Sequence, residues 1–288
     1  MARIAVTGAL GGAGRKIAEH LRGTGHEVVA IDIRPSPNPF FMPSRSVDLS
    51  NYGDAVANLH GCDAVVHYGS NPWPDLDFFS GADRFANNTL ATFNVFQAAA
   101  QLGIERVVWA SSETVQGFPY EDCSPLRVPI DEADEPMPRC AYALSKLACE
   151  LLAREMHKLH DITFIGHRLA NILYPDSADG PGYDDLRAYW ADPHLRRNTL
   201  WKYVDIRDVV SAVQHSLDVD IAGAHVFNIA AADIIMKTPT RELFEAEFPD
   251  TLIDDDLGAF QSPVALERAR AMIGWAPRHS WRDLPQFS

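Results

Sequence analysis

The sequence predicts an α/β fold in which a doubly wound parallel sheet carries a smaller C-terminal lobe. Short apolar runs alternate with amphipathic, alanine-rich stretches, which is the pattern of a parallel sheet covered by helices on both faces. A glycine-rich turn follows the first apolar run directly. After about Arg168 the alternation gives way to polar, proline-bearing and aromatic stretches. The chain therefore divides into a sheet-forming part and a lobe of different character.

The expected elements follow from these patterns. Strands are predicted where apolar runs lie between turn residues, at 4–6, 28–31, 64–67, 106–110 and 162–165. Helices are predicted at 15–22, 83–102 and 141–159, and the last two are long and apolar on one side. The segment from Arg34 to Ser46 contains four prolines and is expected to be a loop. We predict a domain over 1–170 and a lobe over 171–288, with segments around 202–230 returning to the main sheet.

Composition restricts the class of protein. With 288 residues, 47% of them hydrophobic, the chain can bury a large core. Its net charge of -14 would repel nucleic acid and anionic membranes, so neither is expected as a partner. No signal-like or membrane-spanning apolar stretch is visible, and a cytoplasmic protein is expected. The four cysteines lack paired spacing, so we expect neither a metal site nor disulfides.

The glycine-rich turn has the layout of a dinucleotide site. Gly8, Gly11 and Gly14 stand between the first strand and the first helix, and Asp32 ends the second strand. The free N–H groups at the helix start would face a pyrophosphate, and the Asp32 carboxylate would accept from the ribose hydroxyls. A carboxylate there favours NAD over NADP, although Arg34 keeps NADP open. The expected phosphate contacts are Gly8, Gly11, Gly12, Ala13 and Gly14.

A second constellation could carry proton transfer. Tyr142 and Lys146 are four residues apart in a predicted helix and therefore share one face. The strand at 106–110 runs into Ser111 and Ser112, at the edge where ligands bind in open parallel sheets. A phenol with a pKa near ~10 is a poor base at neutral pH, but a neighbouring ammonium and a cationic nicotinamide ring both favour its phenolate. Tyr142 is thus a candidate general base with Ser112 as its partner.

These features resemble the extended short-chain dehydrogenase/reductase superfamily, in its NAD-dependent epimerase/dehydratase branch. Further segments in the family's order carry the resemblance over nearly the whole chain: Asp48-Leu49, His67-Tyr68-Gly69-Ser70, Asn88 to Asn94, Ser111 to Gly117, Arg168 to Asn171, Tyr203 to Val209 and Ile273 to Pro277. Gln116 stands where the family has Tyr. The resemblance implies a Rossmann-type fold, bound NAD, and cofactor contacts at Asp32, Arg34, Asp48, Leu49, Tyr68, Gly69, Ser70, Asn88, Ser111, Tyr142 and Lys146.

Within the family, the layout is most similar to uronate and related aldose dehydrogenases. Residues 198–203 run almost directly into a strand, without the glycine-rich hairpin of relatives that bind nucleotide sugars. Arg187, Arg196 and Arg197 could grip an acid substrate, yet Asn198 stands where uronate dehydrogenases place an Arg. A neutral aldose and a uronate both stay open. The resemblance implies substrate contacts at Ser70, Ser112, Glu113, Thr114, Tyr142, Asn171 and Arg197.

The function indicated is hydride transfer between NAD and a small sugar, sugar acid or similar alcohol. Tyr142 would be the general base, Ser112 would hold the reacting oxygen, and Lys146 would lower the phenol pKa. One alternative is a sugar-nucleotide epimerase or dehydratase that retains NAD. Another is a non-catalytic NAD-binding regulatory protein, against which the intact Tyr142 and Lys146 argue. Trp73, Trp190 and Trp201 would line a sugar pocket or cover the core, and a homodimer through the two long helices is expected.

Overall fold

A seven-stranded parallel sheet forms the centre of the computed structural model, which describes residues 1–37, 43–72, 78–178 and 180–287. The strand order is β10-β7-β5-β4-β1-β2-β3, so the connections reverse direction between β1 and β4. This is the doubly wound, Rossmann-type arrangement, and it confirms the predicted fold class. The strands are β1 (Arg3–Thr7), β2 (Glu27–Asp32), β3 (Ser44–Ser46), β4 (Ala64–His67), β5 (Arg106–Ser112), β7 (Thr163–Leu169) and β10 (Ala224–Ile229).

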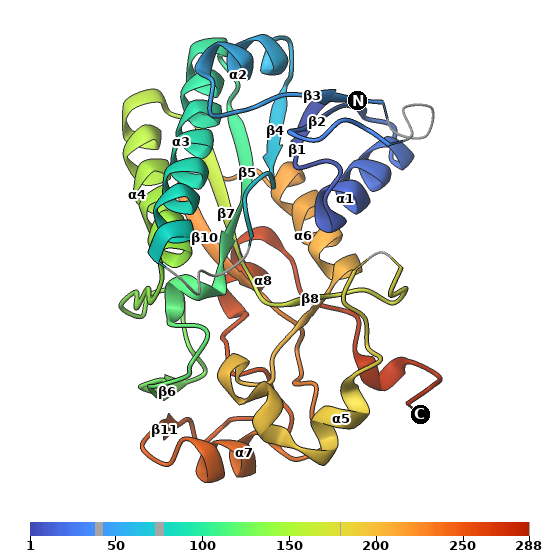
Figure 1. Cartoon of the computed structure of the whole chain (residues 1–288), viewed down its shortest axis with the longest axis vertical. Helices are drawn as coiled ribbons and strands as arrows, with labels where there is room; N and C mark the ends of the chain where they lie inside the picture. Colours follow the sequence, from blue (N-terminus) through green and yellow to red (C-terminus); the bar gives the residue numbers. More distant parts are fainter. Residues whose placement is uncertain (38–42, 73–77, 179, 288) are drawn as a thin grey trace.

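Helices cover both faces of the sheet (Figure 1). Because successive side chains of a strand point to opposite faces, Ile4 and Val6 pack in the cluster beneath α1 (Gly12–Gly23) and α6 (Ile206–Asp218), whereas Ala5 packs in the cluster on the other face. That second face is covered by α2 (Tyr52–Leu59), α3 (Phe78–Leu102) and α4 (Ala141–His160). Both faces are therefore apolar, as a buried parallel sheet requires.

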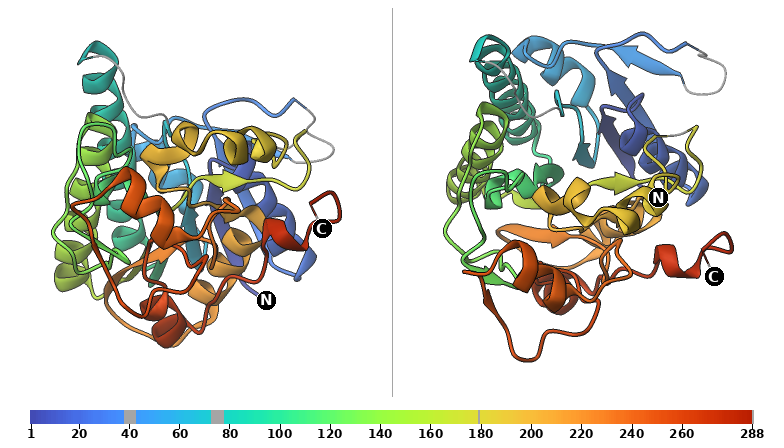
Figure 2. Two further views of the ribbon diagram at one scale, coloured as in Figure 1. Left: turned by 90° about the horizontal axis from the view of Figure 1, so that it is seen from below. Right: turned by 60° about the horizontal axis from the view of Figure 1, so that its bottom comes forward.

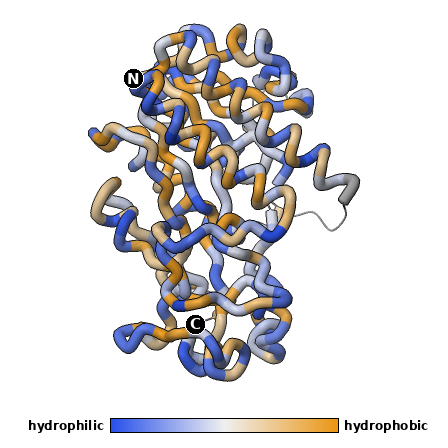
Figure 3. The backbone as a smooth tube through the Cα atoms, turned by 90° about the vertical axis from the view of Figure 1, so that its left-hand side faces the viewer, coloured by the Kyte–Doolittle hydropathy of each residue, from blue (hydrophilic) through white to orange (hydrophobic). Residues whose placement is uncertain are grey.

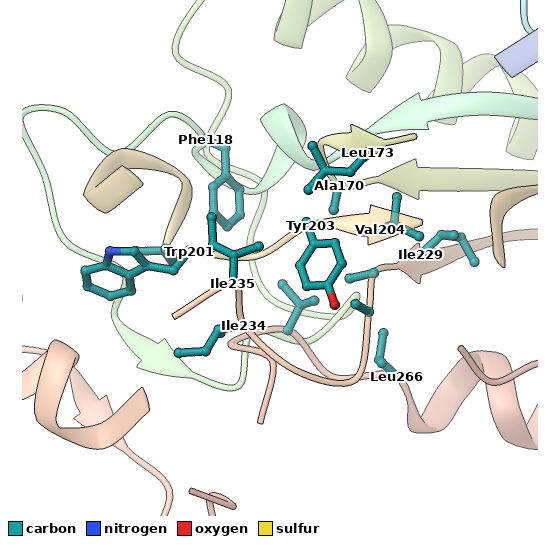
Figure 4. Packing of buried hydrophobic residues seen from close by; sticks show 14 of the residues in the cluster. Phe118, Ala170, Leu173, Trp201, Tyr203, Val204, Ile229, Ile234, Ile235 and Leu266 are labelled. Atoms are coloured by element: carbon teal, nitrogen blue, oxygen red, sulfur yellow. The ribbon is translucent and has the colours of Figure 1, made fainter. Parts of the chain in front are cut away.

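A lobe of short elements lies beyond the carboxyl ends of the strands (Figures 1 and 2). Its buried cluster joins Phe118, Trp201 and Tyr203 to the end of β10 at Ile229 (Figure 4). The lobe is thus packed directly onto the sheet domain. Its elements are β6 (Arg127–Val128), β8 (Ile172–Leu173), α5 (Leu186–Ala191), η2 (Pro193–Thr199), β9 (Val204–Asp205), α7 (Thr240–Glu247), β11 (Leu252–Ile253) and η3 (Trp281–Asp283). The short helix η1 (Glu113–Gln116) follows β5 directly, and α8 (Glu267–Ile273) packs against β10.

Every predicted strand and helix coincides with an observed element of the same type; β4 has the predicted ends, and the other elements differ from their predictions at one or both ends. The prediction of a loop from Arg34 to Ser46 is wrong for its last three residues. These residues form β3, which pairs with β2 so that Ser44 lies opposite Ala30. Residues 38–42 of that segment lie outside the described residues. The chain returns to the sheet through β10, which pairs with β7. The division at residue 170 stays a prediction.

A buried ion pair fixes α4 against two strands. Arg168 of β7 donates from Nε (2.9 Å) and Nη2 (2.8 Å) to the two carboxylate oxygens of Glu150. Ser111 of β5 donates to the same carboxylate at 2.6 Å. The Arg168 and Glu150 side chains are 3% and 7% exposed, so neither charge has water to replace its partner. The pair therefore sets how α4 lies along β5 and β7.

Replacing Arg168 with Met should destabilise the fold strongly, because it leaves the Glu150 carboxylate buried and unpaired. We expect the free energy of unfolding, measured by urea titration, to fall by about 3–5 kcal/mol. The matched control is Arg127→Met, which breaks the half-exposed pair with Asp134 (2.8 Å) and should cost about 1 kcal/mol or less. Equal losses in the two variants would contradict this account of α4.

Candidate active site

The glycine-rich turn between β1 and α1 fits a dinucleotide phosphate. Gly8 has φ of 67°, and an added Cβ would lie 2.8 Å from backbone atoms of Tyr68 and Gly69. A Cβ on Gly14 would lie 2.1 Å from the Gly8 carbonyl oxygen. The N-cap residue of α1, Gly11, offers no side-chain hydrogen bond to the helix start. The first N–H groups of α1, at Gly12 and Ala13, are therefore left for an anion, which suits a pyrophosphate.

Asp32 ends β2 beside this turn. Its carboxylate accepts from the backbone N–H of Leu10 (2.9 Å) and from both the backbone N–H (3.0 Å) and Nε (3.1 Å) of Arg34. Burial works to raise the pKa of Asp32, but the hydrogen bonds from Arg34 and Leu10 lower it on balance. The group is a carboxylate at neutral pH. Arg34, whose side chain is 60% exposed, can move aside for a ribose.

Other residues predicted to contact the cofactor have structural partners. Asn88 of α3 accepts from Asn71 N–H (2.8 Å) and donates to Asn71 O (3.0 Å), which holds the loop after β4. The Tyr68 hydroxyl is hydrogen-bonded to His167 at 2.7 Å. Their cofactor roles stay predictions. Three of the remaining positions have hydrogen-bond partners: the Asp48 side chain accepts from Ser50 N–H, Gly69 N–H donates to Thr7 Oγ1, and the Ser111 hydroxyl donates to Glu150. Leu49 is buried and Ser70 is half-buried.

Ser112, Tyr142 and Lys146 meet at the carboxyl end of β5. Ser112 Oγ accepts from the backbone N–H (3.2 Å) and the hydroxyl (3.0 Å) of Thr114 and is hydrogen-bonded to the Tyr142 phenol. Lys146 Nζ donates to the carbonyl oxygen of Ala110 at 2.8 Å and lies 5.6 Å from the centre of the Tyr142 ring. Because Ser112 Oγ accepts both of these bonds from Thr114, its own proton points away from Thr114 and can be donated to another group. A phenol, a hydroxyl and an ammonium thus converge, as the sequence predicts.

Burial controls the proton equilibria of this group. It raises the pKa of Tyr142 to about 12, against the opposing hydrogen bond from Ser112. It lowers the pKa of Lys146 to about 8. The ammonium therefore stays charged at neutral pH, while the protein alone leaves the phenol protonated. Desolvation dominates the shift of the phenol in the protein alone, and the role of Lys146 in lowering the phenol pKa stays a prediction.

A buried ion pair lies next to Ser112, and it was not predicted from the sequence. Glu113, the residue after Ser112, pairs with Lys202 of the lobe. Lys202 is 1% exposed, and its Nζ lies 3.0 Å from the centre of the Phe118 ring. No local pattern marks Lys202, because its partner is distant in sequence. Of the predicted substrate contacts, Glu113 and Thr114 therefore lie at the site with their polar groups already engaged.

The basic and aromatic residues of the lobe are mostly structural. Arg197 donates to Tyr120 O (3.3 Å) and Glu247 O (3.1 Å) and pairs with the Glu247 carboxylate at 3.1 Å. Trp201 is fully buried. The Arg197 guanidinium is therefore already engaged within the protein and is not available in this structure to bind a substrate carboxylate. Trp73 lies outside the described residues. Arg187 donates to Gln286 O, Arg196 stacks on Tyr189, and Trp190 donates to Ile235 O. Asn171 is half-buried, and its carbonyl oxygen accepts from Val204 N–H.

The part of the chain that the structure describes holds neither a cluster of metal-binding side chains nor a membrane-spanning helix. No group of three or more His, Cys, Asp or Glu side chains in this part of the chain is arranged to hold a metal ion. None of the helices described there has the length and apolar character to cross a bilayer.

The chain is similar to known sugar dehydrogenases and sugar-nucleotide epimerases. L-arabinose 1-dehydrogenase (NAD(P)(+)) of Haloferax volcanii is 30% identical over 206 residues, covering 67% of this chain and 78% of the relative. UDP-glucose 4-epimerase of Lacticaseibacillus casei is 24% identical over 310 aligned positions, covering 96% and 92%. The solved structure of MoeE5 in complex with UDP-glucuronic acid and NAD is 25% identical, with a TM-score of 0.72 and coverage of 98% and 95%.

The family model described as the NAD dependent epimerase/dehydratase family matches residues 4–230, which is most of the chain. This match confirms the resemblance carried by the glycine turn and the Tyr142–Lys146 pair. The chain belongs to the NAD-dependent epimerase/dehydratase family, an extended type of short-chain dehydrogenase/reductase.

Proposed function

We propose that this enzyme oxidises a small sugar or sugar acid with NAD, using Tyr142 as the general base. The observation that carries the proposal is the meeting of Ser112, Tyr142 and Lys146 at the carboxyl end of β5. The match to an L-arabinose 1-dehydrogenase supports a free sugar as the substrate. The lobe over 171–288 would supply the rest of the substrate pocket.

The residues of the chain divide the work of proton transfer. Thr114 donates twice to Ser112, so the Ser112 hydroxyl is oriented toward Tyr142 and toward the substrate oxygen between them. Tyr142, as phenolate, accepts the proton of the substrate hydroxyl. Lys146 holds a positive charge beside the ring and stabilises that phenolate. Bound NAD supplies the hydride acceptor and a further positive charge. The glycine turn and Asp32 would position it.

A sugar-nucleotide epimerase or dehydratase with retained NAD is the second candidate. The match to UDP-glucose 4-epimerase over 96% of the chain favours it. The two activities differ in whether NADH leaves the protein. Incubating the protein with excess NAD and panels of aldoses, uronates and sugar nucleotides separates them, because only a dehydrogenase accumulates NADH. A regulatory NAD-binding protein would accumulate none and convert no sugar.

We infer a homodimer formed through α3 and α4. Large apolar side chains on the outer surfaces of these two helices are a third to a half exposed. Figure 3 views this side of the molecule, where hydrophobic and hydrophilic stretches alternate along the helices. A second copy would cover this surface. The residues concerned are Phe85, Leu90, Phe93, Leu144 and Leu151.

A cytoplasmic location is also inferred. Cys62, Cys123, Cys140 and Cys149 are all free thiols. Unpaired cysteines are the rule where glutathione and thioredoxin keep the compartment reducing. The NAD that the enzyme needs is consistent with the same compartment.

Replacing Tyr142 with Phe should lower turnover by about 10²–10⁴-fold, because the proton acceptor is lost while the ring remains. NAD affinity, measured by calorimetry, should change by no more than a few-fold. Ser112→Ala should also lower turnover. If Tyr142→Phe reduces NAD at the parental rate, the base has been assigned to the wrong residue.

Replacing Asp32 with Ala should weaken the use of NAD by roughly tenfold to a hundredfold in kcat/KM, since a charged hydrogen bond contributes about 1.5–3 kcal/mol. Arg34, released from its carboxylate, should then favour NADP. The matched control, Arg34→Ala, should keep the preference for NAD. An unchanged NAD to NADP ratio in Asp32→Ala would refute the assignment of Asp32 to the ribose.

The pH dependence of oxidation should report the Tyr142 phenol. The active form is the phenolate, so kcat/KM falls as pH drops below the phenol pKa in the NAD-bound protein. Lys146→Met removes a charge that favours phenolate, which raises that pKa and moves the fall to higher pH by about one unit or more. The control is Lys158→Met, at an exposed position of the same helix, where no shift is expected. A shift toward lower pH in Lys146→Met would contradict the role of Lys146.

A further inference from the structure

The buried pair of Glu113 and Lys202 joins the lobe to the catalytic strand. Glu113 is the first residue of η1 and follows Ser112 directly. Lys202 lies in the short link between η2 and β9 of the lobe. Their side chains are 10% and 1% exposed, so each charge depends on the other for compensation. Unpaired, either group would be a buried charge close to the proton-transfer residues.

The backbone before Lys202 adopts an unusual conformation. Leu200 and Trp201 have φ of 51° and 56°, a left-handed region that bulky residues seldom adopt. Tertiary bonds hold this turn, because Trp201 Nε1 donates to Pro193 O at 2.7 Å and Trp201 O accepts from Ile235 N–H at 2.9 Å. Strain of this kind is retained where it places a functional group. Here it turns Lys202 inward, onto Glu113 and the face of Phe118 (Figure 4 shows Phe118 and Trp201).

The charge of Glu113 opposes ionisation of Tyr142. The charge of Glu113, the residue after Ser112, works to raise the pKa of Tyr142. Burial lowers the pKa of Lys202 to about 8, while Glu113 works to raise it, so Lys202 still carries its proton at neutral pH. A cation in contact with Glu113 opposes the field of that carboxylate at the phenol.

We propose that Lys202 is a positioning residue for proton transfer: by pairing with Glu113 it neutralises the acid that follows Ser112 and so allows the Tyr142 phenol to ionise. The inference rests on the proposed function, in which Tyr142 is the base. The lobe thereby completes the site electrostatically.

Other groups that face this pair and the phenol are few among the described residues. One cysteine caps the start of α4, a second cysteine and a lysine lie on α4, a hydroxyl ends β5, and a guanidinium of η2 acts on Lys202. These groups are Cys140, Lys146, Cys149, Ser112 and Arg196. All of them are retained in the variants below, so any change in the phenol arises from Glu113 and Lys202.

The test compares Lys202→Met with the double variant Glu113→Gln/Lys202→Met. Lys202→Met should move the pH below which kcat/KM falls upward by about one unit, because the Glu113 carboxylate then acts on the phenol unopposed. The double variant, with no charge at either position, should return the fall to within about 0.3 units of the parent. Lys237→Met, an exposed lysine of the lobe stacked on Trp190, is the matched control and should cause no shift.

A second readout does not require turnover. Ultraviolet difference titration of tyrosinate in NAD-loaded protein, corrected with Tyr142→Phe, should show the Tyr142 transition moving in the same direction and by a similar amount. Should Lys202→Met fail to fold, Lys202→Gln keeps a hydrogen-bond donor for Glu113 and should show the same direction with a smaller shift. A phenol transition that is unmoved, or a double variant that stays shifted like the single one, would overturn the proposal.

The two readouts also separate this inference from the proposed function. If Tyr142→Phe still turns over sugar, the proposed base is wrong, whatever the titration shows. If Tyr142→Phe is inactive and the Lys202 variant leaves the phenol transition in place, the proposed function stands and the role of Lys202 fails.

Discussion

The site depends on the hydrogen bond between the buried ammonium of Lys146 and the carbonyl oxygen of Ala110. A charge in this dry position needs a fixed acceptor, and the carbonyl oxygen of Ala110 supplies one at 2.8 Å. One stripe of α4 carries Tyr142, Lys146 and Glu150 at successive four-residue intervals, and each contacts the end of β5. The contacts go to Ser112, Ala110 and Ser111 respectively. Helix and strand are thereby held together by the same residues that form the site.

The positive charges near the site act locally and oppose the negative net charge of the chain. The chain carries a net charge of -14, which repels phosphates at long range. The uncapped start of α1 and the two buried lysines provide positive potential where it is needed. Desolvation keeps the phenol of Tyr142 protonated, and a positive charge beside the ring, such as that of Lys146, favours its ionised form. A site poised in this way responds strongly to one added charge.

Local patterns predicted the sheet half of the molecule well. The glycine turn, the strand ends and the spacing of Tyr142 and Lys146 are all short-range features of the sequence. The lobe was not predictable in the same way, because Lys202 and Arg197 are held by partners far away in the chain. β3 was missed because prolines around it masked a strand that exists only by pairing with β2. The Ser111 hydroxyl donates to Glu150, a partner that local sequence patterns did not reveal, and its predicted contact with the cofactor stays a prediction.

The most direct test of the account is the ionisation of Tyr142 itself. Nuclear magnetic resonance of protein labelled at the tyrosine ring carbon that bears the hydroxyl reports phenol and phenolate separately, with Tyr142→Phe identifying the signal. In the NAD-bound protein the account predicts that the Tyr142 signal titrates with a pKa below the ~10 of a free tyrosine. A signal that stays protonated to well above that pH would contradict the account.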